Sequence, residues 1–376
     1  MSDGPVLRSS VRLHHGPGSA ARLADELSRL GSRRPALLAP RSVAHDPGLR
    51  ALLGGAAGRP YAIVESSLAQ HSPIESVLAA AERLRAAGAD AIVVAGGGSA
   101  IVTARATAIV LADGPEFRRP GTAPRLPIVV LPTTPTTASV KAGTAVTERG
   151  LMRRRAMLDP ATRATALIVD PRLLASTPPA LVRDAGLTTL VMAVEGLTTR
   201  RRDAEAEQAL GRAVLELPDL LRRAATEPAD LGVRTRLVLA AAAVGDATDA
   251  TGGALTAAIA HTVGHVTGGH NGPVDAVVLP HALRLCAQRD PASLDRLAAV
   301  LGCAPVAVPL ACTRLLEGIV PVNGLAELGV SREDVPALAA TALMDPAARG
   351  TTFQPVVEEL EDVLLAALAG PVDAHR

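Results

Sequence analysis

The first half of the chain alternates short, uninterrupted apolar runs with longer stretches whose apolar residues recur every three or four positions. Short apolar runs are typical of strands buried on both faces, and the wider spacing is typical of amphipathic helices. Their alternation predicts a doubly wound parallel sheet. We expect strands at 36–39, 61–64, 91–95 and 126–131, and helices at 20–30, 76–87 and 100–111.

From about residue 177 the strand pattern stops, and long patterns rich in Ala, Leu and Val follow. We therefore predict two domains: an α/β, Rossmann-like domain over residues 1–177 and an all-helical domain over 178–376. In such an arrangement ligands bind at the carboxyl ends of the strands. The helices of the second domain are expected at 204–225, 231–247, 294–300 and 355–368.

Composition narrows the class of protein. The 376 residues suffice for two domains, and 38 basic against 37 acidic residues favour neither a nucleic-acid nor a membrane partner. Three cysteines without metal spacing, no run of 18 apolar residues and no signal-peptide pattern predict a cytoplasmic protein. With only three aromatic residues, a substrate pocket has little ring stacking to offer.

A glycine-rich turn, Gly96-Gly97-Gly98-Ser99, follows the apolar run 91–95 and opens the helical stretch 100–111. Glycines at such a turn let backbone N–H groups approach phosphates, and the helix N-terminus adds positive potential. The motif alone is weak. A second predicted strand, 126–131, ends in Pro132-Thr133-Thr134 and strengthens the interpretation as a nucleotide site.

Lys141 is the only lysine among the 38 basic residues. Lys can lose its proton when it is desolvated, whereas Arg cannot, so a single Lys near a predicted site loop is a candidate for chemistry. The alternative is a surface lysine retained by chance.

Together these motifs resemble the iron-dependent alcohol dehydrogenase and dehydroquinate synthase-like superfamily, in particular its maleylacetate reductase branch. Further shared pieces occur in order along nearly the whole chain: LHHGPG at 13–18, HSP at 71–73, TE at 147–148, IVDP at 168–171, TPP at 177–179, AVE at 193–195 and VVLPH at 277–281.

The resemblance implies a nicotinamide cofactor. It assigns Gly97, Gly98, Ser99, Thr133 and Thr134 to the nucleotide. After the first strand, where an acidic residue would bind the adenosine ribose, the chain has Arg41 in the sequence APRS. Because Arg41 can attract a 2′-phosphate, NADPH is at least as plausible as NADH.

The metal site departs from the family. Metal-dependent members use an Asp and a His four residues apart on one helix and two further His. Aligned without gaps, these positions fall on Thr188, Met192, Ala257 and Asn271. Such side chains cannot hold a divalent cation as carboxylate and imidazoles do, so no metal is expected.

A competing alignment with the dehydroquinate synthases matches the segment HTVGH at 261–265. In that case His261, His265 and His270 would form a rearranged metal site. The synthase carboxylate and its second, more distant His have no counterpart here, so we prefer the alignment without metal.

Without a metal, a positioned acid must protonate the oxygen that gains charge during hydride transfer. His261 is the first choice, with Lys141, His265 and His270 as further catalytic candidates. We expect a metal-independent NAD(P)H-dependent reductase of a small keto or enone substrate, with or without a carboxylate, acting as a homodimer. The rivals are a non-redox enzyme on the same fold, such as a cyclase, lyase or condensing catalyst, and a catalytically silent protein.

Overall fold

The computed structural model describes residues 7, 9–116, 121–148 and 153–370, and the chain divides into two compact units. The first comprises Met1–Thr177 and Ala229–Gly245, and the second comprises Pro178–Pro228 and Asp246–Arg376. The sequence predicted the division at 177 but not the segment that returns to the first unit. This segment belongs to α9 (Leu231–Thr251), whose Val238 and Ala242 are buried in the core of the sheet. An apolar helical pattern does not reveal which core it covers.

The first unit contains a six-stranded parallel sheet with the order β1-β8-β5-β4-β2-β3, so the predicted fold class is confirmed. A separate antiparallel hairpin, β6–β7, was not predicted. The strands are β1 (Arg12–His15), β2 (Pro35–Leu38), β3 (Ile63–Glu65), β4 (Ala91–Gly96), β5 (Ile128–Pro132), β6 (Gly143–Glu148), β7 (Arg153–Leu158) and β8 (Ala164–Val169).

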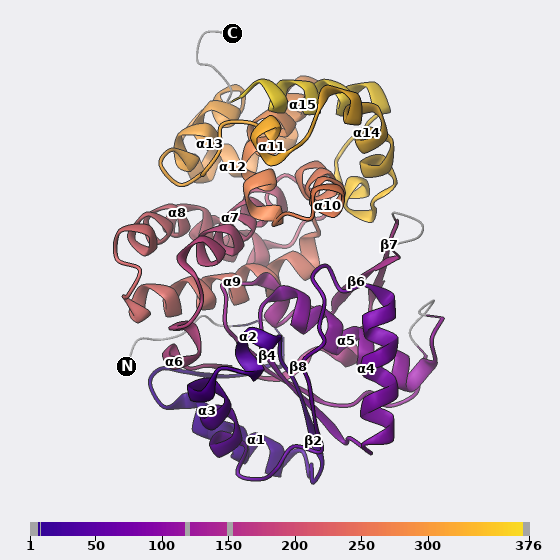
Figure 1. Ribbon diagram of the computed structural model, residues 1–376. Coiled ribbons are helices and arrows are strands. Elements are labelled where there is room, and N and C mark those ends of the chain that lie inside the picture. Colours follow the sequence, from indigo (N-terminus) through magenta and orange to yellow (C-terminus); the bar gives the residue numbers. More distant parts are fainter. Residues whose placement is uncertain (1–6, 8, 117–120, 149–152, 371–376) are drawn as a thin grey trace. The chain divides into compact units, whose positions relative to one another are not determined.

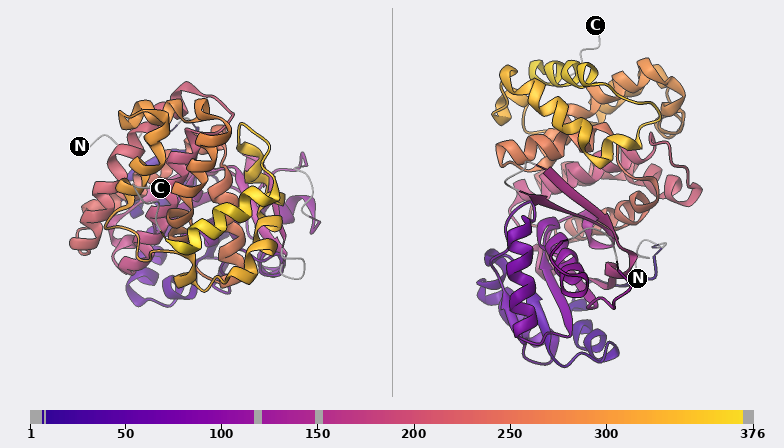
Figure 2. Two further views of the ribbon diagram at one scale, coloured as in Figure 1. Left: turned by 90° about the horizontal axis from the view of Figure 1, so that it is seen from above. Right: turned by 90° about the vertical axis from the view of Figure 1, so that its right-hand side faces the viewer.

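Helices cover both faces of the sheet (Figures 1 and 2). Alternate residues of β4 point to opposite faces: Ile92 and Val94 pack with α4 (Ile74–Ala86) and α5 (Gly98–Asp113), whereas Val93 packs toward α1 and α3. The unbroken apolar run of β4 therefore reflects burial on two sides. The remaining helices of this unit are α1 (Arg22–Arg29), α2 (Arg41–Ala44), α3 (Pro47–Ala57) and α6 (Pro171–Leu174).

The described residues of the second unit form helices and no strands, as the sequence predicted. At its centre, α11 packs against α7, α10, α13 and α15 (Figure 1). The helices are α7 (Pro179–Gly196), α8 (Ala204–Thr226), α10 (Leu255–Thr267), α11 (Asn271–Arg289), α12 (Asp295–Leu301), α13 (Val308–Leu316), α14 (Val335–Met344) and α15 (Val357–Ala369).

Within the described ranges, no single helix has the length and hydropathy needed to cross a bilayer. Two neighbouring helical segments, Pro291–Leu301 and Pro305–Leu316, have the required length and hydropathy only when they are taken together, and the chain bends by 81° between them.

Candidate active site

The glycine turn lies between β4 and α5, where the sequence placed it. Gly97 is the N-cap of α5 and makes no side-chain cap hydrogen bond. A Cβ atom at Gly97 would lie 3.0 Å from Thr134 Oγ1, and one at Gly98 would lie 3.0 Å from Thr136 Oγ1. The turn and the loop after β5 therefore pack so closely that only glycine fits without a shift. This leaves backbone N–H groups at the N-terminus of a long helix, which is an arrangement that suits a pyrophosphate.

The threonine loop is fixed to the same strand end. The Thr133 N–H donates to the Gly96 carbonyl at 3.0 Å, and the Thr177 hydroxyl donates to the Thr133 carbonyl at 2.7 Å. The side chains of Thr133 and Thr134 are buried. The structure thus brings Gly97, Gly98 and Thr134 together at one strand end; their role in nucleotide binding stays a prediction.

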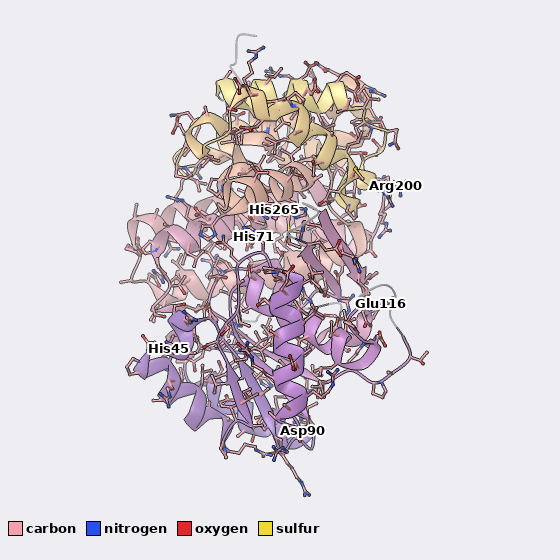
Figure 3. The ribbon with its side chains drawn as sticks, turned by 45° about the vertical axis from the view of Figure 1, so that its right-hand side comes forward. His45, His71, Asp90, Glu116, Arg200 and His265 are labelled. Atoms are coloured by element: carbon pink, nitrogen blue, oxygen red, sulfur yellow. The ribbon has the colours of Figure 1, made fainter. Side chains whose placement is uncertain are left out.

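Ser99 has a structural role in addition to its predicted one. Its hydroxyl accepts the His71 N–H at 3.2 Å, and its carbonyl accepts the Ser72 hydroxyl at 2.9 Å. His71 and Ser72 have φ values of 60° and 49°, a region that non-glycine residues rarely adopt. Thr147 Oγ1 donates to the His71 carbonyl at 2.9 Å and supports this conformation. The strained turn, with His71 labelled in Figure 3, lies beside the start of α5.

Arg41 is exposed at the start of α2, three residues after β2 ends. This is the strand end at which the sequence predicted an interaction with the adenosine ribose or its phosphate. Its place in the first unit is compatible with that prediction, which stays a prediction.

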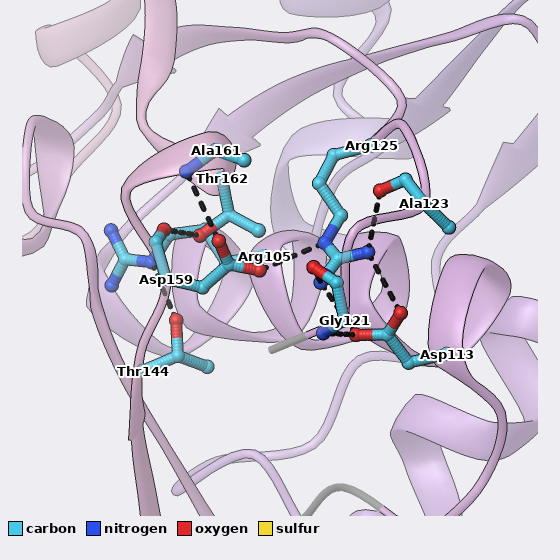
Figure 4. Close-up of polar contacts among 9 residues, drawn as sticks. All are labelled: Arg105, Asp113, Gly121, Ala123, Arg125, Thr144, Asp159, Ala161 and Thr162. Atoms are coloured by element: carbon cyan, nitrogen blue, oxygen red, sulfur yellow. Dashed lines mark hydrogen bonds and ion pairs between the residues drawn. The ribbon is translucent and has the colours of Figure 1, made fainter. Parts of the chain in front are cut away.

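Lys141 lies in the loop between η2 (Thr137–Ser139) and β6. The buried Arg105 of α5 holds this loop: it donates to the carbonyls of Ala138 and Lys141, the latter at 3.0 Å, and to Thr144 Oγ1 at 3.0 Å (Figure 4 draws the last contact). The helix that begins at the glycine turn therefore also positions the lysine loop. Sequence reasoning missed Arg105, although a lone Arg within the apolar stretch 100–111 was a visible signal.

Arg125 organises the opposite end of the same helix. It pairs with Asp113 at the end of α5 and, at 2.8 Å, with Asp159 after β7 (Figure 4). The Arg125 side chain is only 1 % exposed, and its buried ion pairs tie the end of the hairpin to α5.

In the second unit, the four positions that the sequence analysis aligned with the family's metal ligands lie on α7, α10 and at the start of α11. The Thr188 hydroxyl donates to Asp275 Oδ2 at 2.7 Å and links α7 to α11. Gly272 permits the two helices to approach, because a Cβ there would lie 1.9 Å from the Asp184 carbonyl oxygen. At the position aligned with the family's carboxylate ligand, this chain thus has a hydroxyl that donates to a neighbouring carboxyl.

Asp275 is buried, with 3 % of its surface exposed. Burial raises its pKa well above the usual value, the nearby Glu195 raises it further, and the Thr188 hydrogen bond opposes the shift. A carboxyl in this environment favours the neutral, protonated form. Sequence reasoning missed Asp275, whose signal was a single acidic residue inside the apolar run 274–279.

Glu195 fixes the start of α10. Its carboxyl accepts the backbone N–H groups of Ala254 at 3.1 Å, Thr256 at 2.6 Å and Ala257 at 3.2 Å. Burial raises the Glu195 pKa, and these N–H groups act in the opposite direction. Because Ala254 supplies no side-chain cap, Glu195 replaces it and orients the helix that carries Ala257 and His261.

His261 lies in the middle of α10, where its Nδ1 atom is 3.1 Å from Asp345 Oδ2. His265 lies in the last turn of the same helix (Figure 3), and His270 is the exposed N-cap residue of α11. Across the described residues, no group of three or more His, Cys, Asp or Glu side chains is placed to hold a metal ion. Among the described residues, His261, His265 and His270 are thus not gathered as the alternative metal site would require.

The residues present do not fit an iron or zinc ion at the family's position. Thr188 is hydrogen-bonded to a carboxyl, Ala257 has no donor atom, and Met192 and Asn271 supply only a thioether and an amide. A divalent transition metal held by protein needs several anionic or imidazole ligands in a defined geometry. No step of the chemistry below is assigned to a metal.

Comparisons with known proteins place the chain in a family. The profile of the iron-containing alcohol dehydrogenases matches residues 10–171, and that of the Fe-containing alcohol dehydrogenase family's C-terminal domain matches residues 184–368. The chain belongs to the iron-containing alcohol dehydrogenase family. It is an NAD(P)-dependent oxidoreductase, as the sequence analysis expected.

The relatives include maleylacetate reductases. The enzyme of Rhizobium sp. (strain MTP-10005) is 29% identical over 339 residues, which cover 89% of this chain and 90% of the relative. Maleylacetate reductase 2 of Cupriavidus pinatubonensis is 31% identical over 296 residues, covering 78% and 76%. The crystal structure of the maleylacetate reductase from Agrobacterium tumefaciens is 28% identical, with a TM-score of 0.79 and 99% of each chain covered.

Proposed function

We propose that this protein is an NAD(P)H-dependent reductase that works without a bound metal on a small keto or enone substrate, with or without a carboxylate. The observation that carries the proposal is the contrast between an intact phosphate cradle at Gly97 and Gly98 and a ligand set reduced to Thr188, Met192, Ala257 and Asn271. The names of the maleylacetate reductase relatives support the substrate class.

The nucleotide is held by backbone N–H groups of the turn at Gly97 and Gly98, with Ser99, Thr133 and Thr134 around it. When bound, a reduced nicotinamide supplies a hydride. Arg41 selects between the two nucleotides by attracting the 2′-phosphate of NADPH.

His261 is the proton donor to the oxygen that becomes negative as the substrate is reduced, since an imidazolium can give up a proton near neutral pH. The further candidates for binding or protonating an anionic substrate are Lys141, His265 and His270. The loop that carries Lys141 is held by Arg105. Because burial raises the pKa of Asp275, its hydrogen bond with Thr188 favours an uncharged pair at the position where metal-dependent members carry a ligand.

The test combines elemental analysis, nucleotide titration and a chelator. Purified protein should contain less than about a tenth of an equivalent of iron or zinc, a figure that we set as the threshold for a structural or catalytic ion. Calorimetry should show binding of NADPH or NADH, and oxidation of the reduced nucleotide with a panel of small keto acids and enones should persist, within about twofold, after treatment with a chelator.

Full occupancy by a metal, or loss of turnover on chelation that added metal restores, would contradict the metal-independent part. Failure to bind either nucleotide would contradict the reductase and leave the non-redox enzyme as the better interpretation.

The expectations of a homodimer and of a cytoplasmic location also remain proposals, the first to be tested by light scattering of the purified protein. The free cysteines Cys286, Cys303 and Cys312 are compatible with a reducing compartment.

A further inference from the structure

The strongest unassigned feature of the helical unit is a His–Asp pair that joins two segments far apart in the sequence. His261 Nδ1 lies 3.1 Å from Asp345 Oδ2, across 84 residues of chain. The His261 side chain is 24% exposed, whereas that of Asp345 is only 9% exposed. An imidazole that solvent and small molecules can reach is therefore held by a nearly buried carboxylate.

Both oxygens of Asp345 are used. While Oδ2 faces His261, Oδ1 accepts the backbone N–H of Ala347 at 2.8 Å and caps the short helix η9 (Pro346–Gly350). The cap fixes the carboxylate, because it orients the group independently of the histidine. A carboxylate has no proton to give at neutral pH, so the atom that carries a proton between the two side chains is His261 Nδ1.

We propose that Asp345 is a positioning residue that holds His261 in the Nδ1–H form and so directs its Nε2 atom to exchange a proton with the substrate. This inference rests on the proposed role of His261. During reduction the hydride and its electron pair come from the reduced nucleotide, and the Nε2–H proton of the imidazolium goes to the substrate oxygen. The histidine is left neutral with its Nδ1–H bonded to Asp345, and water returns the proton to Nε2.

The side chain at position 345 needs two acceptor oxygens, one for the Ala347 N–H of the cap and one for His261 Nδ1. Asp345→Asn has one acceptor oxygen and one amide NH2 group. If the oxygen keeps the cap, the NH2 group faces His261 Nδ1 and forces the ring into the Nε2–H form. Asp345→Ser keeps a capping oxygen and removes the second acceptor.

The first readout needs no substrate. Protein labelled with nitrogen-15 at its nine histidines gives imidazole correlations that distinguish the two neutral forms, and His261→Gln identifies the signal of His261. We expect the Nδ1–H form in the native protein and the Nε2–H form in Asp345→Asn. A native ring in the Nε2–H form, or no change in Asp345→Asn, would overturn the proposal.

The second readout is turnover. Asp345→Asn and Asp345→Ser should each lower kcat by about 10²–10⁴-fold, the range that an acid–base residue contributes, with nucleotide affinity unchanged. In the His261→Gln background the same substitutions should cause no further loss, since the two residues act as a unit. An additive loss would show that Asp345 acts through the fold alone.

A matched control is Asp46→Asn. Asp46 caps α3 by accepting the Leu49 N–H at 2.8 Å and lies in the other unit. Its replacement should change neither the ring form of His261 nor kcat. If the native protein shows no reductase turnover, the proposed function fails, while the ring measurement still decides whether Asp345 sets the form of His261.

Discussion

The N-termini of α5 and α10 both present backbone N–H groups, but only those of α10 are bonded by a side chain. The N-cap of helix α5 is Gly97, which provides no side-chain cap, and a Cβ at Gly97 would lie only 3.0 Å from Thr134 Oγ1. Helix α10 also lacks a cap from its own N-cap residue, but the buried Glu195 accepts three of its N–H groups. The N–H groups of the first have no side-chain partner at the cap, whereas those of the second are already bonded to the Glu195 carboxyl.

The difference teaches how the two parts of the family's site diverge. Phosphate binding depends on backbone groups and on the absence of side chains, so it persists as long as the glycines do. A metal site depends on the identity of each donor side chain, and the four residues aligned with the family's ligands, Thr188, Met192, Ala257 and Asn271, supply no carboxylate or imidazole. The helical unit has a buried carboxyl at Asp275, whose pKa burial raises, and an imidazole at His261 that pairs with Asp345.

The largest effect is expected in the helical unit. His261→Gln removes the proposed proton donor, and kcat should fall by about 10²–10⁴-fold. The nucleotide affinity should stay within about twofold, because the cradle belongs to the other unit. Steady-state turnover and calorimetric titration measure the two quantities on the same sample. A variant with native turnover would transfer the role to Lys141, His265 or His270.

The next effect is expected at the glycine turn. Gly97→Val places a branched side chain where a Cβ already lies 3.0 Å from Thr134 Oγ1, so the cradle must open. Nucleotide affinity should fall by about 100-fold, equivalent to about 2.7 kcal/mol. Gly54→Val is the control, because Gly54 is exposed and a Cβ there meets nothing within 4 Å. Equal affinity in the two variants would remove Gly97 from the site.

The sequence predicted the glycine turn and its strands better than it predicted the polar contacts of the helical unit. Apolar runs predicted β2, β4 and β5, whose residues are all buried, and also β3, in which Val64 is exposed. The edge strand β1, RLHH, is only partly buried and carries no such pattern. The glycine turn was found because its function and its local sequence coincide. Asp275 and Asp345 were missed because their roles depend on partners 87 and 84 residues away, which no local pattern reveals.

A smaller effect should separate the two nucleotides. Arg41→Ala removes the cation placed to attract a 2′-phosphate, so the ratio of NADPH to NADH affinity should fall by about 10-fold, as for one charge-assisted hydrogen bond. Arg50→Ala, another exposed arginine of the first unit, is the control. A ratio that does not change in Arg41→Ala would show that the nucleotide preference, if any, arises elsewhere.

The smallest effect concerns thermal stability, and it compares the pH dependence of two buried carboxyls, Asp275 in the second unit and Asp170 in the first. Burial raises the pKa of Asp275, so the folded protein holds a proton that the unfolded chain, with a pKa of about 3.9, has lost. That contribution is complete below about pH 4 and is lost as pH rises toward the folded pKa. Asp275→Asn imitates the protonated acid and keeps an acceptor for Thr188. It should raise Tm by about 2–6 °C at pH 8, with a gain that shrinks on acidification.

Asp170 provides the opposite case. Although burial opposes the shift, hydrogen bonds from Arg172 and from the Ala20 N–H lower its pKa, so its contribution is present at neutral pH and disappears as pH falls through the folded pKa. Asp170→Asn should therefore lower Tm at pH 8, and the loss should shrink in acid. Thermal unfolding of both variants between about pH 4 and pH 8 checks the two signs together. If Asp275→Asn were also destabilising at pH 8, Asp275 would be a charged carboxylate in the folded protein, and the proposed uncharged pair of Asp275 and Thr188 would be wrong.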